Sequence, residues 1–131
     1  YAWSEGRAVF ACGSPFAPVN IGGKTLVPRQ CNNSYIFPGV GLGVVATKAR
    51  RVTNDMFLAA ADTLANMVSE ADLAQGSLYP PLKDMRSVSA TIATAVAEVV
   101  FKRGLAGVAK PADTAKFIRE NMYEPKYRMY A

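Results

Sequence analysis

Two adjacent asparagines, Asn32 and Asn33, are the residues of this chain best suited to bind a small ligand. Their side-chain amides offer N–H donors without net charge, on a segment that ends at Pro38-Gly39, where proline and glycine favour a turn. Such donors fit a small carboxylate or carbonyl compound. Asparagine is also common in turns and helix caps, and the spacing alone does not separate these roles.

Gly13 and Ser14 form a second candidate. They follow residues 7–11 (Arg-Ala-Val-Phe-Ala), an apolar run that predicts a buried parallel strand. The pair therefore stands at a strand end, where open α/β sheets bind ligands. An ordinary turn explains Gly13 and Ser14 equally well, and Ser14 has no base near it in the sequence that could make it a nucleophile.

The residue types present exclude several kinds of site. The chain has no histidine, which removes the commonest general base and the usual zinc ligand. Its acidic residues stand at predicted helix starts or on polar faces and form no pattern of metal ligands. Cys12 and Cys31 lack Cys-x-x-Cys spacing and are expected to be buried, reduced thiols, with Cys31 a small packed side chain. The sequence thus predicts neither a catalytic residue nor a metal ligand.

Charge and hydropathy narrow the class of protein further. Fifteen Lys and Arg against ten Asp and Glu give a net charge of +5, but the cations are scattered. This favours a solvated surface over nucleic-acid binding. No apolar run approaches the roughly twenty residues that span a bilayer. The chain lacks an initiator Met and a signal-peptide pattern, so we expect it to begin inside a larger, cytoplasmic protein.

The glycines of residues 39–43 (Gly-Val-Gly-Leu-Gly) invite comparison with a dinucleotide-binding loop. In G-x-G-x-x-G the third glycine would stand at position 44, which is Val44. No strand leads straight into this turn, and no acidic residue follows at the required distance in a strand. The pattern favours glycines that let a helix pack closely on a neighbour.

The remaining pattern predicts a small hairpin and several helices. Gly22-Gly23 between two β-prone runs predicts the hairpin, Thr53 and Ser69 stand at expected helix caps, and residues 79–81 (Tyr-Pro-Pro) should be extended. Helices are expected over residues 38–49, 54–68, 84–103 and 111–122, with a short turn at 69–76. One or two strands of a parallel sheet followed by helices is an odd whole domain, because a lone parallel strand has no partner.

Several longer motifs resemble those of the malic enzymes. Residues 30–39 (Gln-Cys-Asn-Asn-Ser-Tyr-Ile-Phe-Pro-Gly) carry the resemblance best, and the Gln-Cys before the two asparagines looks like the bacterial NAD-type branch. Many relatives have Ser at the place of Cys12, and Pro-Gly-Gln-Gly or Pro-Gly-Gln-Ala in place of residues 28–31 (Pro-Arg-Gln-Cys). The other matching motifs are residues 5–16, 41–43, 55–60, 78–82, 92–93 and 123–128.

The resemblance implies an α/β fold that is the C-terminal portion of a Rossmann-type NAD(P)-binding domain, with one or two strands and a small β-hairpin, followed by a helical C-terminal segment. Residues 1–50 would be the end of the NAD(P)-binding domain and carry the asparagine pair. Residues 51–131 would be the C-terminal helices. The intact protein would be a homo-oligomer.

The resemblance also implies an activity. Malic enzymes oxidise and decarboxylate malate to pyruvate and carbon dioxide, with hydride transfer to NAD or NADP and a Mg²⁺ or Mn²⁺ ion on the substrate. Asn32 and Asn33 match the family's substrate-binding pair, and Gly13 and Ser14 match a loop on the cofactor side. The family's catalytic tyrosine and lysine, its metal ligands and its dinucleotide glycine loop are not in this chain, so the chain alone is expected to be inactive. The competing hypothesis is a non-catalytic helical interaction module derived from the same family.

Overall fold

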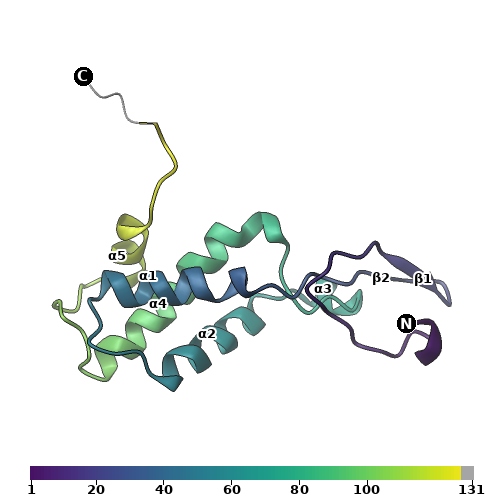
Figure 1. Cartoon of the computed structure of the whole chain (residues 1–131), viewed down its shortest axis with the longest axis horizontal. Helices are drawn as coiled ribbons and strands as arrows, with labels where there is room; N and C mark the ends of the chain where they lie inside the picture. Colours follow the sequence, from purple (N-terminus) through teal and green to yellow (C-terminus); the bar gives the residue numbers. More distant parts are fainter. Residues whose placement is uncertain (128–131) are drawn as a thin grey trace.

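Helix α4 (Met85–Lys102) is the central element of the structure, a computed structural model that describes residues 1–127. Helices α1 (Phe37–Ala46), α2 (Asn54–Asn66) and α5 (Thr114–Asn121) all pack against it. Figure 1 shows these helices gathered in one part of an elongated molecule, with the N-terminal hairpin and α3 (Glu70–Ala74) at the other end. The helices predicted from the sequence are confirmed, although α1 ends three residues earlier and α5 begins three residues later than expected.

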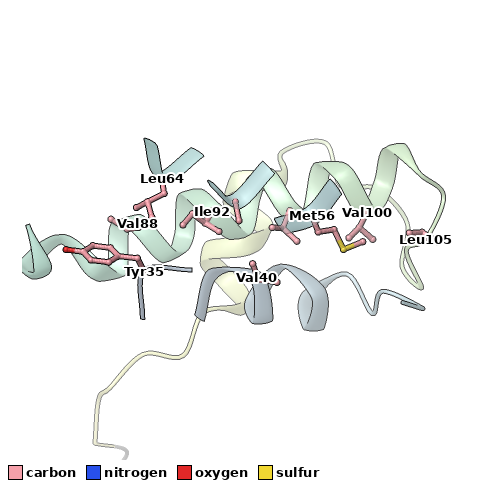
Figure 2. Packing of buried hydrophobic residues seen from close by; sticks show 10 residues of the cluster. Tyr35, Val40, Met56, Leu64, Val88, Ile92, Val100 and Leu105 are labelled. Atoms are coloured by element: carbon pink, nitrogen blue, oxygen red, sulfur yellow. The ribbon is translucent and has the colours of Figure 1, made fainter. Parts of the chain in front are cut away.

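The core lies along α4 because its apolar residues recur every three to four positions. One face of α4 packs with residues of α1, α2 and the segment before α1, as Figure 2 shows. An adjoining face of α4 brings two alanines against Ile118 of α5. The main cluster consists of Tyr35, Val40, Met56, Ala60, Leu64, Val88, Ile92, Val96, Val100 and Leu105.

The glycines of α1 serve close helix packing, as the sequence predicted. A Cβ on Gly39 would lie 2.6 Å from Cγ2 of Ile92, and one on Gly43 would lie 2.8 Å from the carbonyl oxygen of Ala93. Both distances are shorter than van der Waals contact. Gly41, between them, faces no atom within 4 Å. Two of the three glycines therefore set the approach of α1 to α4.

The helix starts agree with the predicted caps in part. Oγ of Ser69 accepts a hydrogen bond from the backbone N–H of Asp72 and so caps α3. Thr53 occupies the N-cap position of α2, but its hydroxyl makes no capping hydrogen bond. At the C-terminal end of α4, Lys102 lies in the last turn and Gly104 adopts a φ of +64°, as expected for the end of a helix.

The predicted hairpin is confirmed. Strands β1 (Val19–Ile21) and β2 (Lys24–Leu26) pair antiparallel, with Val19 opposite Leu26. Gly22 and Gly23 have φ values of +57° and +76°, the left-handed pair that a two-residue type I′ turn requires. Leu26 is buried at the base of the hairpin.

The prediction of a buried strand over residues 7–11 is wrong for this structure. The run belongs to no strand, and Val9 is 70% exposed. Only an isolated parallel bridge forms just beyond it, between Cys12 and Gln30. A parallel strand needs neighbours on the sheet, and the described residues supply a single bridge. The chain is thus a partial α/β unit: a hairpin, one parallel bridge and a layer of helices.

Two further outcomes concern the chain as a whole. Within residues 1–127, no helix combines the length and the apolar character needed to cross a membrane. The motif expected over residues 123–128 is described up to Tyr127 and forms no helix or strand there, while its last residue, Arg128, lies outside the described residues.

Candidate functional site

Asn32 and Asn33 lie at the start of η2 (Asn33–Tyr35), a short 3-10 helix directly before α1. Oδ1 of Asn32 accepts a hydrogen bond from the backbone N–H of Ser34 at 2.9 Å and caps this helix. The cap uses the amide oxygen and leaves the two N–H groups for another partner. Asn33 is exposed. The cap and ligand roles that the sequence left open are therefore compatible at Asn32.

The loop with Gly13 and Ser14 lies beside this segment. The backbone N–H of Cys31 donates to the carbonyl oxygen of Cys12 at 2.7 Å, and Nε2 of Gln30 donates to the carbonyl oxygen of Gly13 at 2.8 Å. Both Gly13 and Ser14 are exposed. The structure thus brings together two groups of predicted site residues that are 18 positions apart in the sequence, from Ser14 to Asn32.

Residues 72–80, which we call the supporting segment, run alongside the chain that leads to the asparagines. The backbone N–H of Val27 donates to the carbonyl oxygen of Gln75 at 2.9 Å, and Oγ of Ser77 donates back to the carbonyl oxygen of Val27 at 2.6 Å. Two residues later, Nη2 of Arg29 lies 2.8 Å from Oδ1 of Asp72. These contacts hold the approach to the site in place.

The supporting segment also reaches the site itself through an aromatic pair. The rings of Tyr35 and Tyr79 are stacked, with centroids 5.2 Å apart and planes at 23°. The hydroxyl of Tyr35 donates to the carbonyl oxygen of Pro80 at 2.5 Å, and the hydroxyl of Tyr79 lies 3.0 Å from Sγ of Cys31. Cys31 and Tyr35 flank the asparagine pair, so the segment supports the pair on both sides.

The charges and hydroxyls around the site have clear protonation states. Hydrogen bonds from the Ser69 hydroxyl and then from the Arg29 guanidinium lower the pKa of Asp72, so its carboxylate stays ionised. The hydrogen bond with the thiol of Cys31, followed by burial, raises the pKa of Tyr79. Burial raises the pKa of Tyr35. Both tyrosines therefore remain neutral hydrogen-bonding groups near pH 7.

Cys31 differs from its prediction. Both Cys12 and Cys31 are free thiols, as expected, but Cys31 is exposed and Cys12 only half-buried. The thiol of Cys31 contacts the hydroxyl of Tyr79, 48 residues later, so it is not a packed core side chain. Sequence reasoning also missed Tyr79 as a residue of this region. The predicted extension of residues 79–81 was the available signal, and Pro81 does have extended angles, φ −59° and ψ 139°.

The acidic residues do not form a metal centre. Among residues 1–127, no three His, Cys, Asp or Glu side chains come together in a way that could hold a metal ion. Asp55 is paired with Arg103, and Glu98 lies 2.7 Å from Lys110, which lowers the pKa of Glu98. The described part of the chain therefore does not fit a divalent metal by itself.

The surface around the asparagines is open. A hollow of about 360 Å³ begins at Ser34, directly after the pair, and continues between Pro38 of α1 and Met85 of α4. A larger open cleft, about 1580 Å³, lies between α4, α5 and residues 122–127 and includes none of the predicted site residues. Asn32 and Asn33 line neither this hollow nor the larger cleft.

Comparisons with known proteins identify what this chain is similar to. Residues 1–101 match the family model described as "Malic enzyme, NAD binding domain". The chain is 50% identical to a chloroplastic NADP-dependent malic enzyme of Zea mays and to another of Oryza sativa subsp. japonica, with 99% of this chain aligned to 21% and 20% of those proteins. It is also 50% identical to NADP-dependent malic enzyme 1 of Arabidopsis thaliana, covering 22% of that protein.

These comparisons qualify the resemblance seen in the sequence. The chain spans about a fifth of the length of the curated relatives it matches. The relatives named above are plant proteins whose names specify NADP, and they do not support assignment to a bacterial NAD-type branch.

Proposed function

This chain belongs to the malic enzyme family, and from that membership we propose that it is the C-terminal part of an intact malic enzyme. Residues 1–50 would complete its NAD(P)-binding domain, and residues 51–131 would form the C-terminal helices. The intact protein would convert malate to pyruvate and carbon dioxide with reduction of NAD or NADP. Alone, this chain would be inactive, because the family's catalytic tyrosine and lysine are not part of it.

Within that reaction, Asn32 and Asn33 would donate hydrogen bonds to the oxygens of malate. The capped geometry of Asn32 is the observation that carries this role, because the bond from Ser34 occupies the amide oxygen and leaves the two N–H groups as donors. A fixed donor loses little freedom when substrate binds, which favours correct placement of the reacting carbon.

Gly13 and Ser14 would form part of the cofactor side of the cleft. Their support is the bridge between Cys12 and Gln30, which holds this loop against the segment of the asparagines. Hydride transfer needs cofactor and substrate in contact, so adjacent chain segments are suited to hold them.

The cofactor would be NADP or NAD. The names of the relatives favour NADP, and a ratio of kcat/KM for NADP to that for NAD well above 1 in the intact enzyme would reject the NAD-type branch.

The Mg²⁺ or Mn²⁺ ion of the family would be held by residues outside the described part of this chain, since no suitable cluster exists within residues 1–127. We further propose that the intact protein is a homo-oligomer located in the cytoplasm. Some relatives are named chloroplastic, and detection of the intact protein in plastids would contradict the cytoplasmic location.

The decisive experiment is Asn33→Ala in the intact enzyme. Loss of hydrogen bonds to a charged substrate costs about 1.5–3 kcal/mol, so the KM for malate should rise by about tenfold or more. Asn66→Ala, at an exposed position at the end of α2, is the matched control and should leave the KM for malate within twofold, or about 0.4 kcal/mol.

The competing hypothesis, a non-catalytic helical interaction module, predicts the opposite result. In that case Asn33→Ala leaves malate turnover unchanged. Malate oxidation by the isolated 131-residue chain would contradict the proposal that the chain alone is inactive.

A further inference from the structure

Tyr79 is the residue of the supporting segment that contacts the chain on both sides of the asparagine pair. Its hydroxyl lies 3.0 Å from Sγ of Cys31, directly before Asn32. Its ring stacks on Tyr35, two residues after Asn33. Tyr35 is only 1% exposed and belongs to the main core cluster, so it is a fixed platform for the ring. Asn32 and Asn33 thus lie between Cys31 and Tyr35, two residues that the side chain of Tyr79 connects.

We infer that Tyr79 is a positioning residue that holds Asn32 and Asn33 in place to bind the substrate carboxylate or carbonyl. This inference rests on the proposed function of the pair. Tyr79 itself need not touch substrate, because it acts through the backbone on either side of the pair. A donor displaced by a fraction of an ångström binds its acceptor less well, and such support from neighbouring residues is what keeps binding groups in register.

The other contacts of the supporting segment cannot replace Tyr79 in this role. The bonds of Val27 and Arg29 fix the chain several residues before the pair. The bond from Tyr35 to Pro80 fixes it only afterwards. Tyr79 alone, among the contacts within residues 72–80 of the described chain, reaches both flanking residues. A tyrosine with the ordinary pKa of 10.0 is already protonated at neutral pH, and the pKa of Tyr79 is raised further.

The test uses Tyr79→Phe in the intact enzyme. Phenylalanine keeps the ring stacked on Tyr35 and removes only the hydroxyl that contacts Cys31. A single hydrogen bond of this kind is worth enough to raise the KM for malate about three- to tenfold. The KM for NAD(P) and the melting temperature should change little, which separates positioning from a general loss of structure.

Two further variants make the test specific. Cys31→Ala removes the same contact from its other end and should raise the KM for malate by a similar factor. The double variant should raise the KM for malate no more than either single variant does, because both substitutions remove the same interaction. Tyr127→Phe is the matched control, since its side chain is fully exposed and lies after α5, and it should leave the KM for malate unchanged.

The outcomes separate this inference from the proposed function. If Asn33→Ala raises the KM for malate and Tyr79→Phe does not, the asparagine site stands and the positioning role of Tyr79 is rejected. If Tyr79→Phe lowers the melting temperature and weakens malate and NAD(P) binding equally, Tyr79 is merely structural and the inference also fails. If neither Asn33→Ala nor Tyr79→Phe affects malate, the proposed function fails together with the inference.

Discussion

Gly39 of α1 lies against Ile92 of α4 so closely that a Cβ on the glycine would be 2.6 Å from Cγ2 of the isoleucine. Ile92 is fully buried and central to the main cluster in Figure 2. Because α1 follows the asparagine segment directly, this contact also fixes where that segment ends. The packing of two helices and the placement of the candidate site are therefore linked.

Substitution of the second close glycine tests this packing. In Gly43→Ala the new Cβ would lie 2.8 Å from the carbonyl oxygen of Ala93, a backbone atom that cannot rotate away. Overpacking of this kind lowers the free energy of unfolding by about 1–3 kcal/mol. Gly41→Ala is the control, since it meets no atom within 4 Å and should be neutral or stabilising. Equal urea midpoints for the two variants would contradict the predicted packing.

Removal of the buried hydroxyl in Tyr35→Phe should destabilise the protein. The variant leaves the carbonyl oxygen of Pro80, which accepts from Tyr35 at 2.5 Å, without its partner in a buried setting. The expected loss is about 1–3 kcal/mol of unfolding free energy, measured by chemical denaturation. Tyr127→Phe, at a fully exposed ring, provides the comparison and should change nothing. A Tyr35→Phe protein as stable as this control would show that the bond contributes no net stability.

The ion pair of Arg29 and Asp72 predicts that the stability of the protein falls at acidic pH. The pKa of Asp72 is lowered in the folded state, first by the Ser69 hydroxyl and then by Arg29, from an ordinary value of 3.8. The carboxylate therefore contributes stability above about pH 3.8, and this contribution is lost as the pH falls through the lower folded value.

Asp72→Asn tests that dependence. The variant should melt at a lower temperature than the unchanged protein at pH 6, and the difference should shrink as the pH approaches 3. Asp62→Asn, on the exposed face of α2, serves as the comparison. A difference in melting temperature that is the same at both pH values would argue that Asp72 acts without its charge.

Apolar side chains at the N-terminal end predict association of the isolated chain. Trp3 is fully exposed, Val9 is 70% exposed and Phe16 is 57% exposed, and exposed apolar patches favour contact with other molecules. Light scattering should show an apparent molecular mass that grows with protein concentration. The double variant Trp3→Ser, Val9→Thr should reduce this growth. Tyr127→Ser, at an exposed position after α5, should leave this growth unchanged. A monomer at all concentrations would contradict the prediction.

The sequence predicts those elements that depend on neighbours in the chain. Gly22-Gly23 defines the hairpin turn, and the period of apolar residues defines α4, because both signals are local. The close-packing role of Gly39 and Gly43 was also correctly predicted. The strand over residues 7–11 was not, since a parallel strand depends on partners far away in the sequence or outside it.

The sequence identifies the candidate ligand-binding residues but not the residues that support them. Asn32 and Asn33 stand out by type and adjacency, whereas the contact between the neighbouring Gln30 and Gly13 is seen only in the structure. The contact between Cys31 and Tyr79 joins residues 48 positions apart and leaves no periodic or spacing signal. The exposure of Cys31 was missed for the same reason, because burial depends on the tertiary arrangement.

The bridge between Cys12 and Gln30 closes the chain between them into a loop whose two ends are held together. At the tip of that loop, a Cβ added to Gly22 or Gly23 would meet nothing within 4 Å beyond the adjacent residues. Lengthening a closed loop at a free tip costs little entropy and does not pull on its base. The hairpin tip is therefore a suitable place to insert a fluorescent reporter or an affinity tag without disturbing the asparagines.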